Sequence, residues 1–156
     1  MENLELVLPE IFISLSIMFL LILGVFKNDS SRLIQNISLL VLLITAVLTF
    51  NETLGINETT LFNESIIIDY MSSLMKIITL IAAFFVLAIS SNYLRTFKIF
   101  KIEYPVLILS SVLGMMIMIS SNDLIVFYMG LELQSLALYV LATFNRDQLK
   151  SSEAGL

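Results

Sequence analysis

The sequence has no cysteine and no histidine among its 156 residues. Without cysteine it cannot form disulfides, iron–sulfur clusters or thiolate zinc sites, and without histidine it lacks the commonest haem and zinc ligand. Charged residues are also scarce, at 13% of the chain, whereas soluble domains carry about a quarter. We therefore expect a chain with no redox centre of its own and with too little charge to cover a water-exposed surface.

Apolar residues make up 58% of the chain, and the mean hydropathy is +0.98. This balance indicates that lipid is the solvent for much of the surface. Five apolar runs are long enough to cross a hydrocarbon core, which takes roughly 17 to 25 helical residues. The sequence therefore predicts an all-α, polytopic membrane protein, with residues 1–156 forming a single membrane domain. The five predicted helices are residues 9–26, 33–50, 70–93, 104–120 and 124–144.

The connections between these runs are short, which predicts that successive helices are antiparallel neighbours. The one long connection is the loop at residues 51–69, and residues 61–68 within it either pair as a small hairpin or lie on the bilayer surface. Asn122 and Asp123 are good N-cap residues for the fifth helix.

Basic residues follow the first, third and fifth predicted helices, whereas the loop at 51–69 and the turn at 120–123 contain none. Because cytoplasmic loops retain Lys and Arg, this asymmetry predicts an N-terminus outside and a C-terminus in the cytoplasm or matrix. The residues concerned are Lys27, Arg32, Arg95, Lys98, Lys101, Arg146 and Lys150.

Glu132 is the candidate catalytic residue that physical chemistry singles out. It lies about 12 to 14 Å along the fifth predicted helix, close to the bilayer midplane. A charge there costs at least a few kcal/mol, so it should face protein or water, and such residues mark ion or proton pathways. We therefore predict that Glu132 is a proton relay.

Hydroxyl groups follow Glu132 along one helical stripe, at Ser135, Tyr139 and Thr143. Two interpretations are open: the hydroxyls bind the carboxylate or water, or they satisfy one another and the backbone in a helix contact. Gly130 would let a neighbouring helix approach closely, as would the small-residue spacing of Ser110 and Gly114.

Lys76 is a second candidate, about two turns into the third predicted helix. Either its long stem carries the ammonium to the headgroup region, or the group takes part in ion transfer. Asp69 lies seven residues earlier on roughly the same face, where water could bridge the two groups. Glu10 follows Pro9 at the start of the first helix, where the helix dipole favours a carboxylate. We interpret it first as a capping residue and second as a functional one.

The sequence of the fifth helix resembles subunit N of proton-pumping NADH-quinone oxidoreductase, respiratory complex I. The resemblance is carried by residues 130–147, GLELQSLALYVLATFNRD, and by residues 152–156, SEAGL. Upstream, Leu8-Pro9-Glu10 and residues 113–124 fit the same family. The resemblance implies an antiporter-like subunit of about fourteen helices with inverted repeats, of which this apparently truncated chain supplies the N-terminal five. It also implies that the family's essential helix-five glutamate is Glu132.

The implied function is proton translocation coupled to NADH oxidation and quinone reduction, which makes the chain part of a translocase. NADH, FMN, iron–sulfur clusters and quinone would bind to other subunits, with no cofactor or metal on this chain. The expected partners are the other membrane subunits of complex I and the lipid bilayer, with no nucleic acid. The expected location is the bacterial cytoplasmic membrane or an organellar inner membrane.

Two other functions remain open at this point. The chain could belong to a multisubunit cation/proton antiporter, or it could be a membrane scaffold that transports nothing. The scaffold predicts that Glu132→Leu is harmless or stabilising, which both transport functions exclude.

Overall fold

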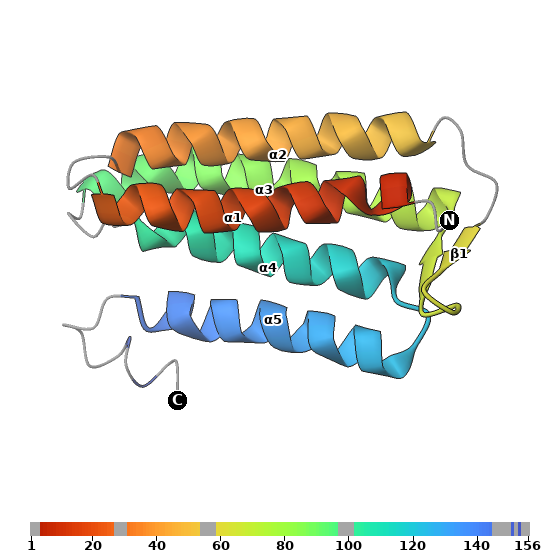
Figure 1. The fold of residues 1–156 in the computed structure, drawn as a ribbon. Coiled ribbons are helices and arrows are strands. Elements are labelled where there is room, and N and C mark those ends of the chain that lie inside the picture. Colours follow the sequence, from red (N-terminus) through yellow and green to blue (C-terminus); the bar gives the residue numbers. More distant parts are fainter. Residues whose placement is uncertain are drawn as a thin grey trace.

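The computed structural model describes residues 4–26, 31–53, 59–96, 102–144, 151 and 153. Long helices dominate this part of the chain and run side by side along one common direction (Figure 1). Short strands β1 and β2 form a hairpin at one end of the bundle, which we call the hairpin end (Figure 1). The elements are η1 (Leu4–Val7), α1 (Leu8–Phe26), α2 (Ser31–Thr53), β1 (Thr59–Leu61), β2 (Ile66–Ile68), α3 (Tyr70–Thr96), α4 (Glu103–Ser120) and α5 (Leu124–Ala142).

All five α-helices of the described residues are long and apolar enough to cross a membrane. Their outward faces carry large apolar side chains at high exposure, including Phe26 at 85%, Val25 at 79% and Ile89 at 73%. Apolar surface of this extent is not tolerated in water by a monomeric soluble protein. The prediction of an all-α, multi-pass membrane protein with five spanning helices is confirmed.

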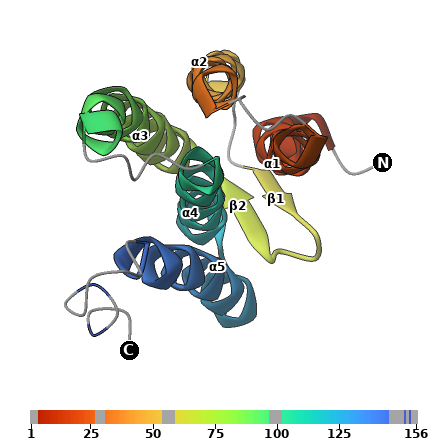
Figure 2. The same ribbon diagram turned by 90° about the vertical axis from the view of Figure 1, so that its left-hand side faces the viewer.

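The first four helices form a four-cornered bundle when viewed along its axis (Figure 2). In this view α1 and α3 occupy opposite corners, with α2 and α4 at the other two (Figure 2). Both α1 and α3 pack against α2 and α4, whereas α5 packs chiefly against α4. Helix α5 is therefore attached to the outside of the bundle along one face.

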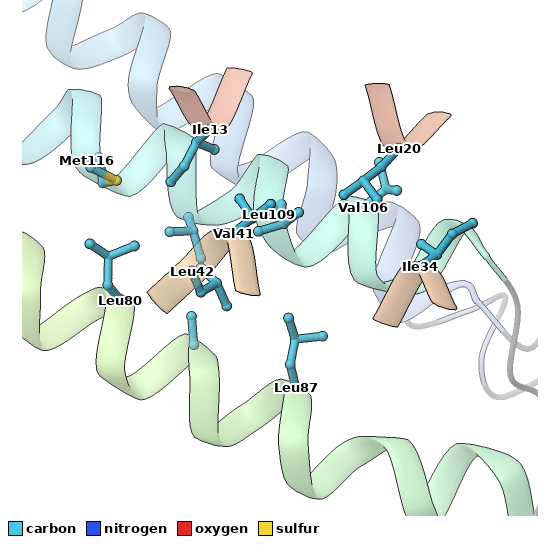
Figure 3. Packing of buried hydrophobic residues seen from close by; sticks show 12 residues of the cluster. Ile13, Leu20, Ile34, Val41, Leu42, Leu80, Leu87, Val106, Leu109 and Met116 are labelled. Carbon is cyan, nitrogen blue, oxygen red and sulfur yellow. The ribbon is translucent and has the colours of Figure 1, made fainter. Parts of the chain in front are cut away.

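The core of the bundle consists of aliphatic side chains from α1 to α4 that point toward one another (Figure 3). Leu20, Leu42 and Leu87 are each at most 1% exposed, as are Leu109 and Met116 on α4. In lipid such packing stabilises helices through van der Waals contact, because the surrounding acyl chains are as apolar as leucine. The buried cluster contains no residue of α5, so α5 must be held in another way.

A row of buried polar side chains follows α2. Ser38, Thr45 and Thr49 donate hydrogen bonds to the carbonyls four residues earlier, at 2.7 to 2.8 Å. Gln35 Nε2 donates to the carbonyl of Leu87 on α3 at 3.3 Å. Hydroxyls that donate to carbonyls of their own helix can be buried in a helix contact.

The loop predicted at residues 51–69 contains an antiparallel hairpin, in which Leu61 pairs with Ile66 and Thr59 with Ile68. This is the first of the two arrangements that the sequence allowed. The tip of the hairpin has Phe62, Asn63 and Glu64 at φ of 54°, 53° and 67°. These values lie in the left-handed backbone region, which residues other than glycine rarely adopt.

The hairpin binds the turn between α4 and α5. Asn122 donates its backbone N–H to the carbonyl of Ser65 at 2.9 Å and its Nδ2 to the carbonyl of Glu64 at 2.7 Å. Asp123 caps α5, accepting from the N–H of Ile125 at 3.3 Å. Of the two residues predicted as good N-cap residues, Asp123 caps the helix, whereas Asn122 binds the hairpin.

Helix α3 begins with a reciprocal cap. The carboxylate of Asp69 accepts the N–H of Ser72 at 2.7 Å, and the hydroxyl of Ser72 accepts the N–H of Asp69 at 3.0 Å. These bonds satisfy two donors that the first turn of a helix leaves open. The N–H and hydroxyl of Ser72, together with the more distant Lys76 charge, lower the pKa of Asp69 below its usual value of 3.8.

Replacing Asp69 by alanine is expected to destabilise the first turn of α3 by about 1 kcal/mol. Because the pKa is lowered on folding, the stability that the carboxylate supplies is present above pH 3.8 and is lost as the pH falls through the lowered folded pKa. Hydrogen exchange at Ser72 measures this, with roughly fivefold faster exchange at neutral pH. Asp69→Asn is the control, because an amide oxygen can also cap. Equal protection in Asp69→Ala and the unmodified protein would contradict the prediction.

Candidate functional site

Glu132 lies at the middle of α5, about 12 Å from Leu124 at the rise of an α-helix. The hydroxyl of Tyr128, one turn earlier, donates a hydrogen bond to Glu132 Oε1 at 2.6 Å. Both side chains lie on the part of α5 that α4 leaves at least partly uncovered. The structure therefore presents a carboxylate at mid-helix whose orientation is set by a phenolic hydroxyl.

Two of the hydroxyls that follow Glu132, those of Ser135 and Thr143, bind backbone carbonyls. Ser135 donates to the carbonyl of Glu132 at 3.1 Å. Thr143 donates to the carbonyl of Tyr139 at 3.2 Å, and the side chain of Tyr139 is 58% exposed. Helical spacing places Ser135 and Tyr139 on the same stripe of the helix as Glu132. The hydrogen bond to the Glu132 carboxylate, however, comes from Tyr128.

The position of Glu132 is fixed by a backbone contact between α4 and α5. A Cβ added at Gly114 would lie 2.7 Å from the backbone N of Gln134 and 2.8 Å from the carbonyl O of Gly130. A Cβ at Gly130 would lie 2.9 Å from the carbonyl O of Gly114. Since real Cβ atoms do not approach backbone this closely, only glycine allows the contact. This explains how α5 is held without contributing to the aliphatic core.

Lys76 lies inside the bundle, with 1% of its surface exposed. Its Nζ forms an ion pair with Glu10 Oε1 at 2.5 Å. The ammonium therefore points across the bundle to α1 and does not extend to the headgroup region. Helices α1 and α3 stand at opposite corners of the bundle (Figure 2), and both run away from the hairpin end (Figure 1). The ion pair therefore joins two parallel helices across the bundle.

The Glu10–Lys76 pair has one unsatisfied oxygen. Glu10 is 9% exposed, and its Oε2 is buried with no hydrogen-bond partner within the described residues. Removing one member of a buried ion pair typically costs 3–5 kcal/mol, roughly, because the other charge is left uncompensated. Replacing both members by apolar groups often leaves stability unchanged. Single variants therefore report the cost of an unpaired buried charge, whereas the double variant reports the function of the pair itself.

Sequence reasoning missed two of these contacts. Tyr128 precedes Glu132 by four residues, the same spacing that relates Ser135 to Tyr139, so a search in both directions along the stripe would have found it. Glu10 and Lys76 both lie close to the start of helices that begin at the same end of the bundle. The similar depth of the two side chains in the bilayer indicates that they could pair. It does not determine which helices are neighbours.

Within the described ranges, no group of three or more His, Cys, Asp or Glu residues is placed to hold a metal ion. The polar groups that the described residues place within the bundle include the Glu10 carboxylate, hydroxyls and the buried Lys76 ammonium.

Residues 121–156 match the family model described as NADH:quinone oxidoreductase/Mrp antiporter, TM. Along its whole length the chain is 66% identical to NADH-quinone oxidoreductase subunit N of Pelagibacter ubique, of which it covers 33%. It is 46% identical over 96% of its length to subunit N of Paramagnetospirillum magneticum, covering 31% of that protein. It is also 46% identical over 99% of its length to subunit N of Bartonella bacilliformis, again covering 31%.

Over nearly its whole length, the chain is similar to curated proteins named NADH-quinone oxidoreductase subunit N. It spans about a third of the length of the curated relatives that it matches. The family-model match begins at Ser121 and therefore includes all of α5, with Tyr128 and Glu132. The family resemblance expected from the sequence is confirmed. The residues that match the family model include the mid-helix carboxylate of Glu132.

Proposed function

We propose that the chain is part of a membrane subunit that moves protons within an NADH-quinone oxidoreductase, and that Glu132 takes up and releases these protons. The supporting observation is the Tyr128–Glu132 hydrogen bond at the middle of α5, inside the matched region. A carboxyl group at this depth is costly unless it has a role, and ion pathways are where such groups occur.

The geometry supports a simple role for each group. The Tyr128 hydroxyl holds one carboxylate oxygen of Glu132, which leaves the second oxygen for water or for a donor on a neighbouring element. The proton is accepted at the carboxylate and released from the carboxylic acid, so no bond between heavy atoms changes. Ser135 supports the helix through the Glu132 carbonyl, and Tyr139 and Lys76 remain candidates for further steps of the same proton path.

The other parts of the reaction are assigned to other subunits. We place NADH oxidation, FMN and quinone reduction on other subunits. The iron–sulfur clusters are placed there too, because this chain has no cysteine or histidine to ligate them. Its partners are the other membrane subunits of the complex and the bilayer. We place it in the bacterial cytoplasmic membrane, and the distribution of basic residues supports an orientation with the hairpin end outside.

A multisubunit cation/proton antiporter is the second candidate function. The matched family model includes Mrp antiporters as well as NADH:quinone oxidoreductases. The curated relatives at 66% and 46% identity are named subunit N of the oxidoreductase, which favours the first function.

Purification of the tagged protein from its own membranes tests this choice. We expect NADH:quinone oxidoreductase activity to co-purify with it in mild detergent. The control is the same tag on an unrelated polytopic protein from the same membranes. Recovery of a complex that exchanges Na⁺ for protons without oxidising NADH would replace the first function by the antiporter.

A further inference from the structure

A cleft of about 530 Å³ opens at the hairpin end between α1, β2, α4 and α5. Apolar side chains form most of its wall, and Glu10, Ser14 and Ser120 are its polar members. Both serine hydroxyls donate to carbonyls of their own helices, Ser14 to Ile11 at 2.9 Å and Ser120 to Met116 at 3.0 Å. Their oxygen lone pairs therefore remain able to accept hydrogen bonds.

Glu10 connects this cleft to the interior of the bundle. Its Oε1 binds Lys76, while its Oε2 is buried and lacks a partner within the described residues. A buried carboxylate oxygen without a hydrogen bond is rare, and ordered water is the usual partner of such a group. A water site needs two to four polar neighbours, roughly, and Glu10, Ser14 and Ser120 line the same cleft.

We propose that this cleft is a water-filled proton-access site, in which Glu10 Oε2 binds water and exchanges protons with it. The ligand is water and the proton that it carries. This site is separate from Glu132, and its role in transport rests on the proposed proton-moving function. A proton from water binds Oε2 and gives the carboxylic acid beside the Lys76 ammonium, and its release restores the ion pair.

Few other charges act on Glu10. Lys76 faces it from α3, and Asp69 at the start of α3 is close enough to feel the Lys76 charge. The cleft residues from β2, α4 and α5 include no titratable group. Among the described side chains of α2, Arg32 is the charged one, and it stands at the opposite end of that helix. Among the described side chains, Lys76 is therefore the charged group that contacts Glu10.

Hydration of the cleft can be measured without reference to pumping. Residues 1–156 contain no cysteine, so a cysteine introduced at Ser14 is unique within them. In the native complex, Ser14→Cys is expected to react with a charged, membrane-impermeant methanethiosulfonate, because thiolate forms in water and not in lipid. Leu15→Cys is the control, since Leu15 is 62% exposed on the outward face of α1. An inert Ser14→Cys, or equal labelling at both positions, overturns the water-filled cleft.

The proton role is tested by removing both charges together. Glu10→Gln/Lys76→Met leaves no lone buried charge, so the complex is expected to assemble. Proton pumping per NADH oxidised is expected to fall by at least about tenfold, as for loss of a proton-transfer group. Glu64→Gln is the control, because Glu64 is an exposed carboxylate at the same end. Normal pumping by the double variant would show that the Glu10–Lys76 pair only stabilises the bundle, and it would overturn the proton role. This conclusion does not depend on the result of the Glu132 variants.

Discussion

Replacing Glu132 by glutamine is expected to reduce proton pumping on the order of 10²-fold, the scale of a lost proton-transfer group. The amide has nearly the same size and still offers an oxygen to the Tyr128 hydroxyl, which donates to Glu132 Oε1 at 2.6 Å. It cannot bind and release a proton, so assembly should persist while transfer fails. The measurement is acidification by membrane vesicles, with NADH oxidation recorded in parallel.

Two further variants show whether the loss comes from the carboxyl group itself. Tyr128→Phe removes the hydroxyl but keeps the proton carrier, so we expect a smaller reduction. Glu103→Gln changes an exposed carboxylate in the first turn of α4, at the opposite end of the bundle, and should pump normally. Full pumping by Glu132→Gln, or improved stability with full activity in Glu132→Leu, would exclude Glu132 as the relay and favour the scaffold.

Replacing Gly114 or Gly130 by alanine is expected to destabilise the α4–α5 contact by about 1–3 kcal/mol, the usual cost of overpacking. The new Cβ would lie 2.7 to 2.9 Å from backbone atoms of the opposite helix, and backbone cannot rotate away as a side chain can. The helices must separate, which moves Glu132 with them. The amount of assembled complex and the hydrogen exchange of α5 amides measure this loss.

Gly24→Ala is the matched control for these changes. Its Cβ would also meet an atom at 2.7 Å, but that atom is Cγ2 of the Ile102 side chain. A side chain can shift by a few tenths of an ångström at less cost than two packed backbones, so the effect should be smaller. Equal losses in all three variants would show that the α4–α5 contact has no special dependence on glycine.

Hydropathy predicted the five helices because lipid imposes one simple requirement on a spanning segment. Each must be long, apolar and internally hydrogen-bonded, and the observed α1 to α5 meet that requirement. The sequence left two arrangements open for the loop that holds the hairpin, because strands of only three residues each carry little pattern. What decides its position is the pair of hydrogen bonds from Asn122, a residue almost sixty positions later in the chain.

The partner of Lys76 could not be chosen from sequence alone. Helical spacing places groups along one helix, but it does not determine which helices occupy opposite corners of a bundle. Asp69 was the nearer acid in sequence, yet its carboxylate binds Ser72, and Lys76 binds Glu10 on α1. In contrast, Glu132 could be selected from depth alone, because an isolated acid in the middle of an apolar run is unusual wherever its neighbours lie.

The contact between Gly114 and Gly130 also sets the height of Glu132 relative to α4. Sliding α5 by one residue would bring a side chain of α5 against the carbonyls of α4, where no space exists for it. The two helices therefore keep one register and move as a rigid pair. Any conformational change that raises or lowers the Glu132 carboxyl in the bilayer must carry α4 with it, together with the hairpin bound at the turn between them.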